Sequence, residues 1–173
     1  MNEAYQNLLT RRSCRAYTEE AIKPEDLEAI LEAGKFAPTA MGKQSPLMVV
    51  VQDADMMRKI ERLNAAVVGN PEAHTFYGAP MVVIVFGTDT LIGTADANLV
   101  IGNLLNGAHA VGVDSCYIWR AREVFATEEG MAMKKAWGIP ENYVGVGNVI
   151  LGYGKSEGKR EPAPRKVDYV RIV

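Results

Sequence analysis

The stretch from Thr94 to Val111 constrains the fold more than any other part of the sequence. It is the longest helical pattern, and its apolar side chains are spread too widely for one face of a helix: Leu99, Val100, Leu104, Leu105, Ala108 and Val111. A helix that is apolar on nearly all sides has to be covered on nearly all sides. We therefore expect a long helix, in the core or at a subunit interface, around which the fold is built.

Shorter patterns of both periodicities lie on either side of this helix. Apolar runs predict strands over residues 47–51, 81–86, 114–118 and 144–151, and the chain ends in a strand-like segment, 167–173. Helical spacing predicts helices over residues 3–9, 23–34, from a cap at Asp53 through Leu63, and 127–137. Residues 64–78 are expected to form a loop over the ligand site or a frayed helix end. The order of the elements indicates an α/β or α+β fold.

Length and composition exclude several classes of protein. A chain of 173 residues with 48% hydrophobic content is typical of one domain with a real core, so we assign residues 1–173 to a single domain. A net charge of -2 excludes a generally basic nucleic-acid binder. No apolar run is long enough for a membrane span, and the first residues lack the order of a signal peptide, so we expect a cytoplasmic protein. Two distant cysteines and two histidines predict neither a disulfide framework nor a metal site.

The segment Arg11-Arg12-Ser13-Cys14-Arg15 is the most unusual local feature. Arginine is suited to binding phosphate, because its planar guanidinium donates two parallel hydrogen bonds and keeps its proton. Basic pairs also occur on solvated helix ends, and for this segment alone that interpretation stays open. A second unusual segment, residues 37–46, is a loop of small and polar residues between a helical pattern and a strand, where backbone groups are free to meet a ligand.

Two nucleotide-binding motifs are nearly present, and both fail on their context. Gly145-Val146-Gly147-Asn148-Val149-Ile150 has Ile where a dinucleotide-binding turn needs its third glycine, and it lies inside a predicted strand. Gly154-Lys155-Ser156 resembles the end of a P-loop, but Val149 stands at the place of the first glycine and no helix follows. The sequence therefore favours neither a Rossmann dinucleotide site nor a triphosphatase.

Taken together, the arginine segment and the loop after it resemble the FMN-dependent nitroreductase family. That family carries Arg-(Arg/His)-Ser-x-(Arg/Lys) and, after a spacer, Ala-Pro-Ser/Thr-x-x-Asn-x-Gln-Pro. The corresponding segments here are residues 11–15 and Ala37-Pro38-Thr39-Ala40-Met41-Gly42-Lys43-Gln44. The likeness continues through Gly112-Val113-Asp114-Ser115-Cys116-Tyr117-Ile118, Leu151-Gly152-Tyr153 and Pro164-Arg165-Lys166. These matches follow one another in the same order over almost the whole chain.

The resemblance implies an α+β fold with a central, mostly antiparallel sheet flanked by helices and a long buried central helix. It also implies a homodimer with FMN at the interface, in which the C-terminal tail, residues 155–173, packs on the partner subunit. FMN is then the bound cofactor and NAD(P)H the reductant. Hydride is expected to pass from NAD(P)H through flavin N5 to an electron-poor acceptor, such as a nitroaromatic or a quinone, in ping-pong order.

The same resemblance assigns roles to individual residues. Arg11 and Arg15 are implied to bind the FMN phosphate, Arg12 and Ser13 the ribityl chain or ring, and Arg165 and Lys166 the phosphate from the tail. Further flavin contacts are implied for Asn64, for Tyr117, Ile118, Trp119 and Arg120, and, from the partner subunit, for Pro38, Thr39, Ala40, Met41, Gly42 and Gln44. The backbone N–H near Trp119 would face flavin N5. No side chain is assigned a catalytic role.

One departure and several alternatives accompany this assignment. Gly42 stands where the family commonly has Asn, so the substrate preference does not carry over. A non-catalytic flavin-binding or sensing protein is an alternative, as is a flavin enzyme of different outcome, such as a dehalogenase or a flavin-fragmenting enzyme. Cys14 and Cys116 are interpreted as bystanders, because nothing marks either as a low-pKa thiolate, and His109 as a structural residue of the long helix.

Overall fold

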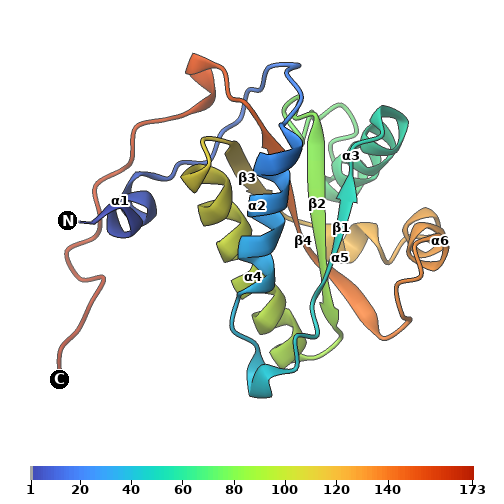
Figure 1. Cartoon of the computed structure of the whole chain (residues 1–173). Helices are drawn as coiled ribbons and strands as arrows, with labels where there is room; N and C mark the ends of the chain where they lie inside the picture. The colour runs from blue at the N-terminus through green and yellow to red at the C-terminus, as the bar shows by residue number, and fades with distance from the viewer. Residues whose placement is uncertain (1) are drawn as a thin grey trace.

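The computed structural model describes residues 2–173 and places them around one antiparallel sheet (Figure 1). Its strands lie in the order β1 (Leu47–Val51), β2 (Met81–Thr88), β4 (Tyr143–Gly152) and β3 (Asp114–Ile118). All three neighbouring pairs are antiparallel, with Val49 opposite Ile84 in one pair and Tyr117 opposite Val149 in another. The α+β class and the four internal strands predicted from the sequence are therefore confirmed.

Six α-helices connect and cover the strands in the described part of the chain: α1 (Glu3–Thr10), α2 (Pro24–Lys35), α3 (Ala54–Val68), α4 (Leu91–Ala110), α5 (Ala121–Val124) and α6 (Glu128–Ala136). Four of them begin at a capping side chain. Asn2, Asp53, Thr90 and Thr127 each accept a hydrogen bond from a backbone N–H of the first turn, which satisfies a donor that the helix itself cannot satisfy. Short 3₁₀ turns follow at Ala40–Gly42 and Ser156–Gly158.

The sheet separates two apolar layers, and β2 contributes to both. Val83 and Val85 face α2 and α4, whereas Ile84 and Phe86 face α3, α5 and α6. Figure 1 shows the two groups of helices on opposite faces of the sheet. A strand that is covered on both faces has no reason to alternate apolar with polar residues. This explains why the run from Met81 to Phe86 is apolar throughout.

Within a single chain the long helix α4 is covered along one side, while α1 covers only the C-terminal end of the other side. Its buried side, which includes Ile101 and Leu104, packs on α2 and the sheet. Leu91 and Leu99 lie on the other side, where their side chains are 92% and 48% exposed. The sequence predicted that α4 is buried on nearly all sides, and a single chain buries only one of its two sides. Burial of the second half at a subunit interface stays a prediction.

Both ends of the chain lie apart from the sheet. Figure 1 shows α1 and the C-terminal tail on the same side of the molecule, beyond α4. Residues 159–173 are almost all exposed, and the structure has no strand over 167–173. The strand-like pattern at the C-terminus therefore forms no strand within this chain, because no sheet edge of its own chain lies beside it. A second correction concerns residues 64–78, where helix α3 continues to Val68 before the loop begins.

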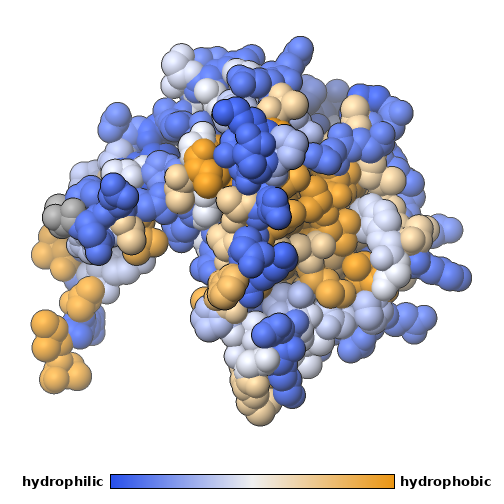
Figure 2. Space-filling view, in the orientation of Figure 1, coloured by the Kyte–Doolittle hydropathy of each residue, from blue (hydrophilic) through white to orange (hydrophobic). Residues whose placement is uncertain are grey.

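The surface carries one further uncovered apolar area, beside the edge strand β1. A hollow is lined there by Met48, Val49, Val50, Val51, Met56 and Trp137. Figure 2 shows apolar side chains gathered over this part of the molecule, and a second apolar group at the end of the tail. Among residues 2–173, no helix combines the length and the apolar character that crossing a membrane requires.

Candidate functional site

A cavity of about 300 Å³ brings together several of the residues predicted to contact flavin. Its walls come from α3, the loop before β2, and the turn between β3 and α5. The residues that line it are Arg15, Asn64, Val68, Thr75, Tyr77, Cys116, Tyr117, Ile118, Trp119 and Arg120. Arg15, Asn64 and the whole predicted segment 117–120 are therefore neighbours in space.

The arginine segment reaches this cavity because it runs alongside β3. Ser13 pairs with Ser115 in a parallel bridge, and the N–H of Cys14 donates to the carbonyl of Ser115 over 3.0 Å. The N–H of Arg15 donates to the carbonyl of Gly158 over 2.8 Å. Backbone pairing on both sides thus fixes where the arginine side chains leave the chain.

The guanidiniums of this segment differ in what they already bind. Arg12 donates from Nη1 to the carbonyls of Leu9 and Arg11, at 2.8 and 2.7 Å, and so ends helix α1. The Nη1 of Arg11 is buried and has no hydrogen-bond partner among residues 2–173. Within the same residues, neither Arg11 nor Arg15 forms an ion pair. A buried N–H donor without an acceptor is costly, so the half-buried guanidinium of Arg11 is suited to binding an anion.

Two buried thiols lie beneath this basic group. Burial raises the pKa of Cys116, and the positive charges of Arg15 and Arg11 oppose that rise, which places both guanidiniums within electrostatic reach of one cavity residue. Burial likewise raises the pKa of Cys14. Both thiols are therefore neutral near pH 7 and add no negative charge that could satisfy the arginines.

Buried amide side chains hold the turn between β3 and α5 in place. Asn148 donates from Nδ2 to the carbonyl of Ile118 over 3.3 Å, and Asn64 donates from Nδ2 to the carbonyl of Trp119 over 2.8 Å. Arg120 follows with a φ of 78°, in the left-handed region that non-glycine residues rarely adopt. Such a backbone costs about 1–3 kcal/mol and persists only where surrounding contacts impose it.

The opposite wall of the cavity comes from a loop whose residues the sequence did not single out. Glu61 accepts from the N–H of Phe76 over 2.7 Å and so fixes the loop between α3 and β2. Thr75 presents a buried hydroxyl that has no partner in the described part of the chain. Tyr77 has a φ of 54° and is half-exposed beside the cavity. Val68 and Cys116 also line the cavity. In the sequence, these residues were indicated only by the expectation that residues 64–78 form a loop over the ligand site or a frayed helix end.

The predicted loop 38–46 lies away from this cavity, beside the N-terminal half of α4 (Figure 1). Asp96, whose side chain is buried, accepts from the N–H of Ala40 over 3.0 Å, and Thr39 accepts from the N–H of Gln44 over 2.9 Å. Met41 and Gln44 have φ values of 55° and 49°. The Met41 side chain is 81% exposed. The loop is thus held in a defined shape with its tip uncovered.

The tail pair Arg165 and Lys166 does not line the cavity within one chain. Both residues are exposed, and Arg165 Nη1 lies 3.5 Å from the carbonyl of Ala163. Lys159, which the sequence reasoning missed, lies closer to the basic group and pairs with Asp114 at 2.8 Å. Its signal in the sequence was weak, because lysines are common in exposed tails.

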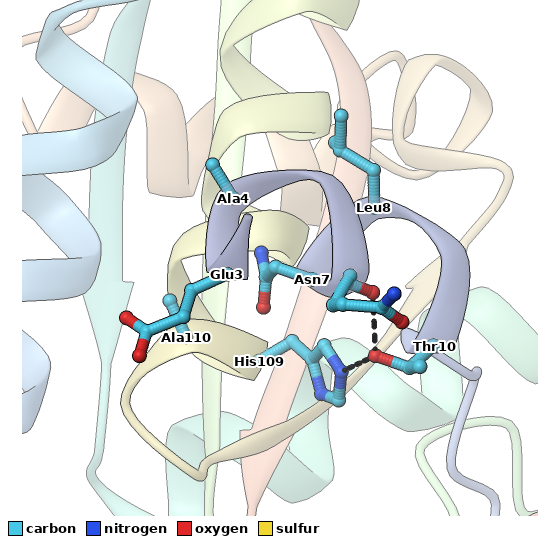
Figure 3. Close-up of a pocket in the computed structure, with 8 residues that line it drawn as sticks. Glu3, Ala4, Asn7, Leu8, Thr10, His109 and Ala110 are labelled. Atoms are coloured by element: carbon cyan, nitrogen blue, oxygen red, sulfur yellow. Dashed lines mark hydrogen bonds between the residues drawn. The ribbon is translucent and has the colours of Figure 1, made fainter. Parts of the chain in front are cut away.

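A second hollow, of about 730 Å³, lies between α1 and the C-terminal end of α4 (Figure 3). Here Thr10 Oγ1 and His109 Nε2 are 2.9 Å apart, and Asn7 donates from Nδ2 to the carbonyl of Asn106 over 2.9 Å. Burial lowers the pKa of His109, and Lys159 lowers it further. His109 thus attaches α1 to α4, as expected for a structural residue, and none of the predicted flavin contacts lines this hollow.

Comparison with known proteins gives one consistent family. Residues 8–153 match the model of the nitroreductase family. A relative from Archaeoglobus fulgidus, provisionally named NADH dehydrogenase/NAD(P)H nitroreductase, is 33% identical over 168 residues, covering 91% of this chain and 88% of the relative. The NADPH-flavin oxidoreductase of Vibrio harveyi is 25% identical over 173 residues, covering 94% of this chain and 70% of the relative. A crystal structure of a nitroreductase with bound FMN from Bacteroides fragilis superposes with a TM-score of 0.90 at 28% identity, covering both chains completely.

Replacing Asp96 by alanine tests whether this carboxylate holds the loop 38–46. The change leaves the N–H of Ala40 without its acceptor, which we expect to lower the free energy of unfolding by about 1–3 kcal/mol. Asp89→Ala is the control, because it breaks only the exposed pair of Asp89 with Arg122 and is expected to cost less than about 1 kcal/mol. Urea unfolding measures both. Equal losses would contradict a special role for Asp96.

Proposed function

Because the chain belongs to the nitroreductase family, whose pattern matches residues 8–153, we propose that it is an oxidoreductase that binds FMN and uses NAD(P)H as reductant. The names of the relatives and the FMN-bound structure from Bacteroides fragilis support this assignment. When bound, FMN would supply the redox chemistry, namely acceptance of hydride at N5 and reduction of an electron-poor acceptor such as a nitroaromatic or a quinone. The chain itself binds and orients the reactants.

The observation that carries this proposal is the half-buried guanidinium of Arg11, whose Nη1 is buried and has no hydrogen-bond partner within residues 2–173. A phosphate monoester brings close to two negative charges and three acceptor oxygens, which suit a fork of N–H donors. Arg15, four residues along, lines the cavity, and within residues 2–173 it forms no ion pair. The residues present therefore fit the phosphate of FMN. Arg165 and Lys166 are proposed to approach the phosphate once the tail is docked.

The cavity walls supply polar groups for the ring. The side chain of Thr75 offers a hydroxyl that lacks a partner within residues 2–173, and the turn at Trp119 and Arg120 offers backbone N–H groups. Tyr117 and Trp119 add apolar surface, with ring centroids 5.9 Å apart. We propose that the isoalloxazine lies along Tyr117 to Arg120, with Ser13 and Arg12 at its polar edges and Asn64 behind the turn, near the ring. Direct contacts of these residues with flavin stay predictions.

A homodimer would complete this site. The loop 38–46 lies away from the cavity of its own chain, yet it is shaped and exposed. The uncovered side of α4 and the hollow beside β1 both need a cover. The tail, with Val170 and Ile172 exposed, offers apolar side chains that nothing in its own chain receives. We propose that two copies associate through α4, exchange their tails, and each place Pro38 to Gln44 against the partner's flavin. The cytoplasmic location also stays a prediction.

Turnover tests the enzymatic part of the proposal. The purified protein mixed with FMN is expected to be yellow, to bleach when NADH or NADPH is added without oxygen, and to regain its colour when a quinone or nitrobenzene follows. Initial rates at several acceptor concentrations should give parallel double-reciprocal lines. Binding of FMN without bleaching would support the non-catalytic alternative. A protein that does not bind FMN would contradict the proposal.

Arg11→Gln tests the phosphate role. We expect the affinity for FMN to fall at least tenfold, the loss of about 1.4 kcal/mol or more that one charged hydrogen bond supplies. Affinity for riboflavin, which lacks the phosphate, should change little, so the preference for FMN over riboflavin should collapse. Quenching of flavin fluorescence measures both ligands. Arg58→Gln is the control, since Arg58 is exposed and pairs only with Asp55 in the described chain. An equal loss for both ligands would argue against phosphate contact.

Charges introduced into the tail test the exchanged dimer. In the double variant Val170→Asp, Ile172→Asp, two apolar side chains of the tail would become anionic and could no longer enter an apolar groove. We expect the dissociation constant of the dimer to rise at least tenfold and bound FMN to be lost with it, as measured by analytical ultracentrifugation with absorbance detection. Met131→Asp, on the exposed side of α6, is the matched control. A wild-type protein that binds FMN as a monomer would overturn this arrangement.

A further inference from the structure

The two most buried amides of the chain both serve the turn between β3 and α5. Asn64 and Asn148 are 1% and 0% exposed. They donate to consecutive carbonyls, those of Trp119 and Ile118, from α3 and from β4. Each amide donates from Nδ2 to the backbone of one turn beside the cavity, whereas the Oδ1 of Asn148 has no partner within residues 2–173. The peptide group after Trp119 is therefore held from α3, and the peptide group after Ile118 is held from β4.

The direction of those peptide groups determines where their N–H groups point. No peptide bond in residues 2–173 is cis. In a trans peptide the N–H lies opposite to the preceding carbonyl. Because Asn64 draws the Trp119 carbonyl inward, the N–H of Arg120 points away from Asn64, toward the outer side of the turn. Arg120 itself occupies the left-handed region with a φ of 78°, a conformation that the amides on both sides help to impose.

We propose that Asn64 is a positioning residue: by holding the Trp119 carbonyl, it aims the Arg120 N–H at the flavin ring and thereby sets the reduction potential of the bound flavin. This inference rests on the proposed function and deepens it. The amide nitrogen of Asn64 is already engaged, at 2.8 Å, with Trp119. Asn64 therefore acts on the ring through the turn. Asn148 supports the same turn one residue earlier.

A preorganised N–H donor has a predictable effect on the redox equilibrium. Electron density on the ring rises when flavin is reduced, so a fixed donor stabilises the reduced form more than the oxidised form. When the turn is free to rotate, the donor is no longer fixed and that difference shrinks. Loss of the Asn64 amide should therefore make the bound flavin harder to reduce, even where FMN still binds.

The potential of the bound flavin in Asn64→Leu tests this inference. The substitution keeps a similar volume and removes the donor to Trp119. We expect the equilibrium constant for two-electron reduction to fall about tenfold, which corresponds to about 30 mV. The measurement is a spectroelectrochemical titration of the full-length, FMN-loaded protein against a reference dye. Asn64→Ala, which also removes the donor and adds no charge, is measured as a second variant with the same expectation, so that the test stands if the leucine variant does not fold.

Asn103→Leu is the matched control. Asn103 also donates from Nδ2 to a backbone carbonyl, that of Ala33, over 2.9 Å, but it lies between α4 and α2 and does not line the cavity. The Asn103→Leu variant should be less stable than the wild-type protein, with no change in the reduction potential of the bound flavin. Potentials equal to wild type in both Asn64 variants would overturn the inference and leave the proposed function intact. A wild-type protein that binds no FMN would instead contradict the proposed function. Binding of FMN to the wild-type protein is measured first, so the two failures are distinguished.

Discussion

The pairing of the arginine segment with β3 is the interaction on which the site depends. Through the bridge between Ser13 and Ser115, a segment at the start of the chain lies beside a strand from its second half. Arg15 from the first and the turn that ends the second then line the same cavity. The pairing also buries Cys14 and Cys116, whose pKa values burial raises, so the arginines meet no thiolate beneath them. The Nη1 of Arg11 stays without a hydrogen-bond partner within residues 2–173.

Backbone strain is confined to the two places where ligand contact is proposed. Four non-glycine residues within residues 2–173 have positive φ: Met41, Gln44, Tyr77 and Arg120. The first two lie in the loop 38–46 and the other two line the cavity. Part-buried polar contacts lie beside each conformation: those of Asp96 for the loop 38–46, of Glu61 for Tyr77 and of Asn64 for Arg120. Strain that is held in this way keeps backbone donors in fixed directions, as a preformed binding site requires.

The single chain leaves apolar surface uncovered in three places: one side of α4, the hollow beside β1, and the tail. Monomeric proteins rarely expose contiguous apolar areas of this kind. The exposed loop 38–46 adds a shaped segment that has no ligand in its own chain. These features support the proposal that a second copy covers the apolar surface and supplies the missing wall of the flavin site. They also explain why a tail with a strand pattern forms no strand here.

The sequence by itself determined the elements that local physics controls. The unbroken apolar run of β2 indicated a strand covered on both faces, Asp53 and Thr127 marked where helices begin, and the matches around Arg11 to Arg15 indicated the family. Only the tertiary structure decided which groups meet. It placed Asn64 inside α3 facing Trp119, brought Thr75 and Tyr77 to the cavity, and used Arg12 to end α1. Local patterns fix how a segment folds, whereas its partners depend on packing between segments distant in the sequence, which no local pattern records.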